Sequence, residues 1–212
     1  MMKIQFKNVC PHRFEELSLK SDVWNNDFII QDGMRYQLRG PSGRGKTSFL
    51  SYLLGHRKDY NGEVFINNRA VLDINIDEWV ELRREKISSV FQDLQLIEKI
   101  SVADNIALVP KFANGHGLSK AKNMLGDLGM ADKWEAQVET LSFGQKQRVA
   151  IVRALCKPFD LLICDEPFSH LDTMHKAKCV DLIESRLTEE NAGILLTSLD
   201  GENQLDLKSI HL

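Results

Sequence analysis

Residues 40–47 read Gly40-Pro41-Ser42-Gly43-Arg44-Gly45-Lys46-Thr47, which matches the pattern G-x-x-x-x-G-K-[ST] of a phosphate-binding P-loop. Glycine suits such a loop because a Cβ would hinder the backbone N–H groups from turning inward around phosphate oxygens. The lysine reaches the outer phosphates, the threonine hydroxyl can coordinate Mg²⁺, and the following helix directs its positive N-terminal end at the same anion. We therefore expect residues 40–47 and Ser48 to bind a nucleotide together with Mg²⁺.

The segments on either side of the loop supply the strand and the helix that the motif requires. Residues 34–39 alternate apolar and polar side chains, as a strand does, and residues 48–54 carry apolar side chains at helical spacing before Gly55. The alternative interpretation is a glycine-rich turn without a ligand. That alternative is disfavoured because the motif and both flanks agree.

The composition is that of a reduced globular protein. The 212 residues suffice for one large domain with a sizeable core, and a formal net charge of −3 gives no sign of nucleic-acid binding. The four cysteines lack C-x-x-C spacing, which favours reduced packing residues over metal ligands. The sequence shows neither a signal-peptide h-region nor an apolar run of bilayer length, so we expect a cytoplasmic protein that needs another protein to hold it at a membrane.

The rest of the chain predicts an α/β fold with a mainly parallel sheet, an N-terminal antiparallel β part and a helical insertion. Asn67-Asn68 predicts a hairpin between strands at 63–66 and 69–72, because asparagine tolerates positive φ. Apolar runs at 160–164 and 193–197 are typical of buried parallel strands. The other predicted elements are strands at 3–9, 27–31, 87–91 and within 205–212, and helices at 77–86, 101–108, 119–128, 145–156 and 173–187.

Two acids, Asp165 and Glu166, directly follow the apolar run at 160–164. Ligands bind at the carboxyl ends of the strands in open α/β sheets. The first acid suits Mg²⁺, held directly or through water, and the second suits polarisation of an attacking water. The alternative is a pair of solvated acids, which are common at strand ends, but the upstream P-loop makes the catalytic interpretation the stronger one.

Three further motifs connect the chain to a known family. Leu141-Ser142-Phe143-Gly144-Gln145 stands where the ABC (ATP-binding cassette) family has its signature L-S-G-G-Q, and Ser169-His170-Leu171-Asp172 resembles the D-loop of that family, usually S-A-L-D. Gln92 matches the glutamine of its Q-loop. Over nearly its whole length, the chain thus resembles the nucleotide-binding subunit of an ABC transporter. Residues 91–96 and 101–106 are similar to the branch that serves lipoprotein release, macrolide-type export and the cell-division complex.

The resemblance implies an ATPase that binds ATP between two cassettes, either a homodimer or a heterodimer with another ABC ATPase. It also implies a single domain over 1–212, with the core and its antiparallel part in 1–92 and 157–212 and a helical part in about 93–156. A transmembrane permease would dock near Gln92 and the helical part, placing the chain peripherally on the inner face of the cell membrane. The substrate of transport and its direction would be set by that partner.

The same resemblance assigns roles to single residues. Catalysis would fall to Lys46, Gln92, Glu166 and the residue at position 198, while Mg²⁺ would be held by Thr47, Gln92 and Asp165. The opposing subunit would contribute Ser142, Gly144 and Gln145 to the γ-phosphate. An aromatic side chain before the P-loop would stack on adenine, for which Phe14 is the better candidate and Trp24 the second. A plain core role is the alternative for Phe14.

Two positions depart from the family pattern. Phe143 replaces the first glycine of the signature pair, so its ring must turn away or crowd the closed dimer. Ser198 stands where the family has its switch histidine, and serine is shorter and carries no positive charge. We therefore expect hydrolysis to be present but slow, since one lost electrostatic contact costs about 10²–10³ in rate.

Two other functions compete with the transporter ATPase. One is an ATP-dependent regulatory clamp of a membrane complex, which Phe143 and Ser198 favour and the intact Glu166 disfavours. The other is a soluble ABC protein that acts on nucleic acid or the ribosome. Such proteins usually carry two cassettes or long coiled-coil insertions, and this sequence has neither, so no nucleic-acid partner is expected.

Overall fold

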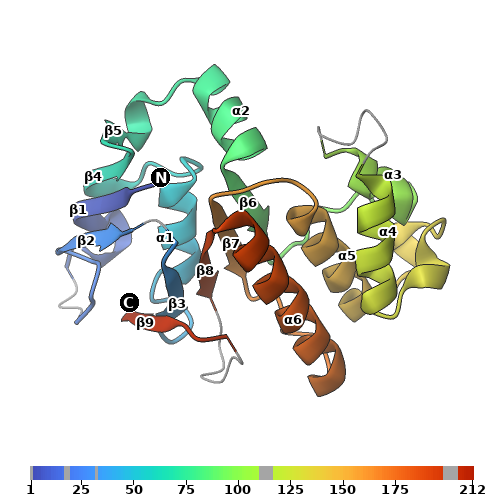
Figure 1. The fold of residues 1–212 in the computed structure, drawn as a ribbon. Coiled ribbons are helices and arrows are strands. Elements are labelled where there is room, and N and C mark those ends of the chain that lie inside the picture. Colours follow the sequence, from blue (N-terminus) through green and yellow to red (C-terminus); the bar gives the residue numbers. More distant parts are fainter. Residues whose placement is uncertain (1, 17–19, 32, 110–116, 198–204) are drawn as a thin grey trace.

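The computed structural model describes residues 2–16, 20–31, 33–109, 117–197 and 205–212. Within them, a parallel sheet of five strands lies between an antiparallel sheet of four strands on one side and a group of helices on the other (Figure 1). The order of the parallel sheet is β6 (Ile87–Val90), β7 (Leu161–Asp165), β8 (Gly193–Thr197), β3 (Arg35–Arg39) and β9 (Lys208–His211). The order of the antiparallel sheet is β2 (Asp27–Ile30), β1 (Ile4–Pro11), β4 (Tyr60–Ile66) and β5 (Arg69–Ala70). The predicted α/β fold with both kinds of sheet is confirmed.

Strand β7 forms the wall between two hydrophobic clusters. Leu162 and Cys164 belong to the cluster that includes the helical part, whereas Leu161 and Ile163 belong to the cluster beneath the antiparallel sheet. Successive side chains of a strand point to opposite faces, so one apolar strand can serve both clusters. This double burial explains why the run at 160–164 shows no alternation of apolar and polar residues.

Helix α1 (Lys46–Leu53) follows β3 and packs between the two sheets. The ring of Phe49 stacks on Phe6 of β1 with the ring centroids 4.3 Å apart. The helix ends before Gly55, whose φ is +68° and where a Cβ would lie 2.5 Å from the ring of Trp79. The predicted stop at Gly55 is therefore confirmed, and only glycine fits there without a shift of the tryptophan.

Four of the five remaining helices start at a side-chain cap that is visible in the sequence, whereas the helix that begins at Leu118 follows Gly117 and has no side-chain cap. Ser101 and Asp104 form the predicted capping box, with the Asp104 amide donating to the Ser101 hydroxyl at 3.0 Å. Ser142 caps a helix that begins two residues earlier than expected. These helices are α2 (Ile76–Glu85), α3 (Val102–Ala107), α4 (Leu118–Asp127), α5 (Phe143–Leu155) and α6 (Thr173–Glu190).

The hairpin at Asn67-Asn68 is confirmed, with φ values of +51° and +66°. Its second strand is shorter than predicted, because β5 ends at Ala70 and residues Val71–Asp73 form a 3₁₀ turn. That turn buries Val71 and leaves Leu72 exposed, so the apolar pair does not continue along the sheet. Short 3₁₀ helices also occur at His12–Phe14, Ala131–Lys133 and Val138–Thr140.

Candidate functional site

The P-loop joins the end of β3 to the start of α1. Gly43 and Gly45 have φ values of +84° and +99°, a region that glycine enters without steric cost. The Lys46 side chain folds back across the loop and is only 7% exposed. Its Nζ donates to the carbonyl of Gly40 at 2.7 Å and to that of Pro41 at 3.4 Å. The lysine is thus held across its own loop by two main-chain carbonyls.

Two aromatic rings support this loop from the protein side. A Cβ on Gly45 would lie 3.0 Å from the Trp24 ring and 3.1 Å from the Phe14 ring. The Trp24 indole also donates to the carbonyl of Arg44 at 3.2 Å. Both rings are buried, and the Arg13 guanidinium lies 4.5 Å from the centroid of the Phe14 ring. This packing accords with the core role considered for Phe14, while stacking of either ring on adenine stays a prediction.

A cavity of about 350 Å³ opens beside the P-loop and is lined by all three predicted Mg²⁺ ligands, Thr47, Gln92 and Asp165. They come from the start of α1, the segment after β6 and the end of β7. A hydroxyl, an amide oxygen and a carboxylate are hard donors of the kind that Mg²⁺ prefers, and Mg²⁺ typically takes few protein ligands besides water and phosphate.

The two acids at the end of β7, Asp165 as its last residue and Glu166 directly after it, both contact Thr197, a residue that sequence analysis did not assign to the site. The Thr197 hydroxyl donates to the Asp165 carboxylate at 2.5 Å and accepts from the Glu166 amide at 3.1 Å. The Thr197 side chain is fully buried at the end of β8, next to β7 in the sheet. Glu166 itself has a φ of +50°, which directs the chain away from the strand. The sequence feature that could have pointed to Thr197 is its polar side chain at the end of an otherwise apolar strand.

Ser198 follows Thr197 directly but lies outside the described residues. Ser48 is buried, and its hydroxyl accepts a hydrogen bond from Arg57 at 3.2 Å. Of the P-loop residues, Pro41, Ser42, Gly43 and Thr47 are exposed.

The signature segment forms the N-terminus of α5. The Ser142 hydroxyl accepts from the Gln145 amide at 3.3 Å, and the Gln145 side chain accepts from the Ser142 amide at 2.9 Å. This capping box leaves Ser142 exposed at the positive end of a helix of 13 residues. Such an end favours a negatively charged group in front of it.

Phe143 turns toward the D-loop of its own chain. Its ring is 44% exposed and lies against His170, with the ring centroids 4.3 Å apart. Gly144 sits so close to the same segment that a Cβ would lie 2.7 Å from the His170 carbonyl oxygen. The second glycine of the signature is therefore required within this chain, and the phenyl ring at the first position finds room beside the D-loop.

Gln147, also missed by sequence analysis, ties α5 to the residues after β7. Its side-chain amide donates to the Ser169 hydroxyl at 3.0 Å and to the Glu166 carbonyl at 3.4 Å. It also accepts from the His170 amide at 3.1 Å. Gln147 is 2% exposed, so a polar residue on the buried face of a helix was the sequence signal.

The structure does not bring the signature to the P-loop of the same chain. Among the described residues that line the cavity at Thr47, Gln92 and Asp165, none belongs to the signature segment. The chain thus presents two separate groups: the P-loop with the acids, and the exposed helix end at Ser142.

Comparison with known proteins agrees with this geometry. A family model described as ABC transporter matches residues 23–169. The macrolide export ATP-binding/permease protein MacB of Campylobacter jejuni is 33% identical over 201 residues, which cover 93% of this chain and 30% of MacB. The thiamine import ATP-binding protein ThiQ of Aliivibrio fischeri is 32% identical over 88% of this chain and 79% of ThiQ. The chain therefore spans under a third of MacB but most of ThiQ.

The fold is close to that of MJ0796 from Methanocaldococcus jannaschii. The dimeric structure of this ABC transporter cassette superimposes with a TM-score of 0.79 at 28% identity, covering 93% of this chain and 88% of that one. A dimeric post-hydrolysis structure of the same cassette, bound to ADP and Pi, gives a TM-score of 0.78. None of the described helices is both long and apolar enough to span a membrane. Motifs, fold and relatives agree, and the chain belongs to the ABC transporter family.

Proposed function

We propose that this chain hydrolyses ATP to drive a membrane transporter, by closing as a dimer around ATP and reopening after hydrolysis. The observation that carries the proposal is the convergence of Thr47, Gln92 and Asp165 on one cavity beside the lysine-bearing loop. The second cassette is another copy or a related ATPase, and a transmembrane permease holds the pair peripherally on the inner face of the membrane. The transported substrate is set by the permease and not by this chain.

Within one subunit, each residue has a distinct task. Backbone amides of residues 40–48 and the Lys46 ammonium bind the phosphates, with Lys46 exchanging its loop carbonyls for phosphate oxygens. Thr47, Gln92 and Asp165 would hold Mg²⁺, which would neutralise the charge that develops on the phosphates. Glu166 orients and polarises the attacking water. Thr197 fixes both acids relative to each other.

The opposing subunit completes the site. Ser142, Gly144 and Gln145 lie at an exposed helix N-terminus, which suits the γ-phosphate of ATP bound to the partner's P-loop. The separation of the two groups within one chain supports this division of labour, because neither group alone surrounds a triphosphate. Closure then depends on ATP, which makes the dimer a two-state element.

Turnover in the isolated chain is slow in this proposal. Ser198 cannot supply the positive charge of a histidine, and the Phe143 ring occupies the surface next to Ser142 that faces the partner. Phe143 also favours a second candidate function, an ATP-dependent regulatory clamp with little or no hydrolysis. The two candidates differ in whether Glu166 has a catalytic effect.

Steady-state ATP turnover of the purified chain distinguishes them. For the transporter ATPase we expect slow wild-type turnover, background turnover for Glu166→Gln, and faster turnover for Ser198→His and for Phe143→Gly. Nucleotide binding by Glu166→Gln, followed by fluorescence of a labelled ATP analogue, verifies that the variant still folds and binds. Wild-type turnover equal to that of Glu166→Gln, with no gain from Ser198→His, would support the clamp instead.

A further inference from the structure

The two aromatic rings that support the P-loop offer no exposed face to a nucleotide base. Phe14 is 6% exposed and Trp24 is 1% exposed. The Phe14 ring lies against the backbone at Gly45 and against the Trp24 ring, whose centroid is 6.4 Å away. The Trp24 ring in turn packs against Phe49 and Tyr52. A base can stack only on a flat group with an accessible face, so a base next to this loop needs another side chain to rest on.

Arg13 lies over the Phe14 ring and is exposed to solvent. Its guanidinium carbon is 4.5 Å from the centroid of that ring. Both residues belong to the 3₁₀ helix His12–Phe14, which directly follows β1 and turns Phe14 into the core while Arg13 stays outside. A guanidinium is planar and stacks on flat groups with either face. Arg13 can therefore cover Phe14 with one face and accept a second flat group on the other.

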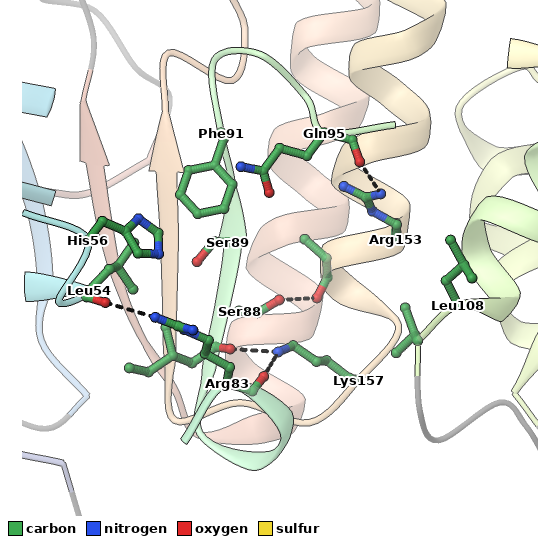
Figure 2. Close-up of a pocket in the computed structure, with 13 residues that line it drawn as sticks. Leu54, His56, Arg83, Ser88, Ser89, Phe91, Gln95, Leu108, Arg153 and Lys157 are labelled. Atoms are coloured by element: carbon green, nitrogen blue, oxygen red, sulfur yellow. Dashed lines mark hydrogen bonds between the residues drawn. The ribbon is translucent and has the colours of Figure 1, made fainter. Parts of the chain in front are cut away.

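Other cations of the chain are already engaged by hydrogen bonds. Figure 2 shows examples around a cavity of about 460 Å³ between the edge of the parallel sheet and the helical part. There Arg83 donates to the Leu54 carbonyl at 3.0 Å. Arg153 likewise donates to the Gln95 carbonyl at 2.7 Å. Among the described residues, by contrast, no hydrogen bond or ion pair holds the Arg13 guanidinium, which leaves it available to a ligand.

Only one ring separates Arg13 from the phosphate-binding loop. A Cβ on Gly45 would lie 3.1 Å from the Phe14 ring, and Gly45 is followed directly by Lys46 and Thr47. The ribose of a nucleotide joins its base to its phosphates, so the base lies beside the loop that holds the phosphates. The exposed face of the Arg13 guanidinium is on that neighbouring surface.

We propose that Arg13 binds the adenine of ATP by stacking its guanidinium on the purine, with the Phe14 ring behind it. The inference rests on the proposed function, which supplies ATP as the ligand, and it adds the residue that holds the base. Phe14 acts as a positioning residue, because its cation–π contact orients the guanidinium before the nucleotide arrives. Stacking uses the π-face of a base and not its edge, so this contact holds a purine without reading its hydrogen-bonding groups.

Binding of ADP and of inorganic pyrophosphate to the full chain tests the proposal. The two probes share a diphosphate and only ADP carries adenosine, so the ratio of their dissociation constants isolates the adenosine contribution. Isothermal titration calorimetry at pH 7 without added Mg²⁺, in about 0.15 M salt to screen distant charges, gives both constants. Arg13→Ala should reduce the advantage of ADP over pyrophosphate about tenfold, a loss typical of one stacking contact.

Two further variants separate the flat shape of the side chain from its charge. Arg13→Tyr supplies a flat group without the charge and should recover most of the ADP advantage, whereas Arg13→Lys keeps the charge and should lose nearly as much as Arg13→Ala. Lys7→Ala is the matched control, because Lys7 also lies over a phenylalanine ring, 4.6 Å from the centroid of Phe65, on the part of β1 that pairs with β2 and β4. It should leave the ratio unchanged. Thermal unfolding of each variant identifies any that fail to fold.

An ADP advantage that stays within twofold of the wild type in Arg13→Ala would overturn the proposal, because the base would then rest elsewhere or Arg13 would act on the phosphates alone. Full retention of the advantage in Arg13→Lys would do the same, and so would an absence of ADP binding by the wild type at millimolar concentration. These measurements need no hydrolysis, so they stand apart from the turnover of the wild type and Glu166→Gln. Failure of hydrolysis and failure of base stacking are thus observed separately.

Discussion

Replacement of Thr197 by valine removes one hydroxyl and keeps the shape of the side chain. In the structure that hydroxyl donates to the Asp165 carboxylate at 2.5 Å and accepts from the Glu166 amide at 3.1 Å. Asp165 is 6% exposed and Thr197 is fully buried, so water does not readily replace the lost partner. A hydrogen bond to a charged group contributes about 1.5–3 kcal/mol, and a buried group left unsatisfied costs a similar amount.

We therefore expect Thr197→Val to lower the free energy of unfolding by about 1.5–3 kcal/mol. In a domain of this size, that corresponds to a fall in Tm of roughly 3–12 °C. Turnover should fall by tenfold or more, because the Asp165 carboxylate loses its hydroxyl partner, while the Glu166 amide keeps only its bond to the Thr197 carbonyl at 3.2 Å. Urea unfolding followed by tryptophan fluorescence gives the first quantity, and steady-state phosphate release gives the second.

Thr197→Ser is the matched control, since it keeps the hydroxyl and loses only a methyl group. It should retain most of the turnover and pay mainly the small packing penalty of one methyl group, about 1 kcal/mol. The reasoning is refuted if Thr197→Val unfolds within about 0.5 kcal/mol of the wild type, the range typical of neutral surface changes. It is equally refuted if serine and valine reduce turnover alike.

Three further outcomes follow from the described contacts. Gly144→Ala should lower the free energy of unfolding by about 1–3 kcal/mol, because the new Cβ would lie 2.7 Å from the His170 carbonyl oxygen. Gly126→Ala in α4 is the control, since its Cβ would meet no atom within 4 Å, and it should be neutral or stabilising by up to about 1 kcal/mol when urea midpoints are compared. Burial lowers the pKa of Lys157 to about 8 in the folded chain, so between pH 8 and 9 the folded chain loses this proton while the unfolded chain keeps it. The free energy of unfolding should therefore contain a contribution that rises with pH over this range. Urea midpoints measured from pH 8 to 9 should show this rise in the wild type and not in Lys157→Met. Gln147→Leu should lower the free energy of unfolding by about 1–3 kcal/mol and reduce turnover, because the Ser169 hydroxyl and the His170 amide lose their partner. Gln145→Leu removes one half of an exposed capping box and should lower the free energy of unfolding by less.

Local chemistry made several elements predictable from sequence. The hairpin at Asn67-Asn68, the capping box at Ser101 and the stop at Gly55 depend on residues within a few positions of each other, and all three are confirmed. The strand at 160–164 was recognisable because a strand buried on both faces must be apolar throughout. The P-loop and the two acids at the end of β7 could be placed because a short local pattern identifies the first and the apolar run before them identifies the second.

Contacts between distant segments were beyond such reasoning. Thr197 is 32 positions from Asp165, and only the pairing of β7 with β8 brings them together. Arg83, Arg153 and Lys157 line one cavity although they come from separate elements, and each looks like a solvated charge in its own segment. The shortened β5 was also missed, because burial of Val71 through a 3₁₀ turn depends on what lies beneath it. Site roles that need a second subunit stay predictions.

Gln147 has a consequence for how two nucleotide sites would communicate. It stands one turn after Gly144 on α5 and holds the Glu166 carbonyl, Ser169 and His170. In the proposed dimer, Gly144 faces one ATP while Glu166 acts on the other. The buried Gln147 amide therefore connects the segment at Gly144, which would contact the ATP bound to the partner subunit, with Glu166, which would act on the ATP bound to the same chain. Such a connection makes the two sites cooperative, so that ATP at one should change the affinity for ATP at the other by a coupling free energy of about 1–3 kcal/mol.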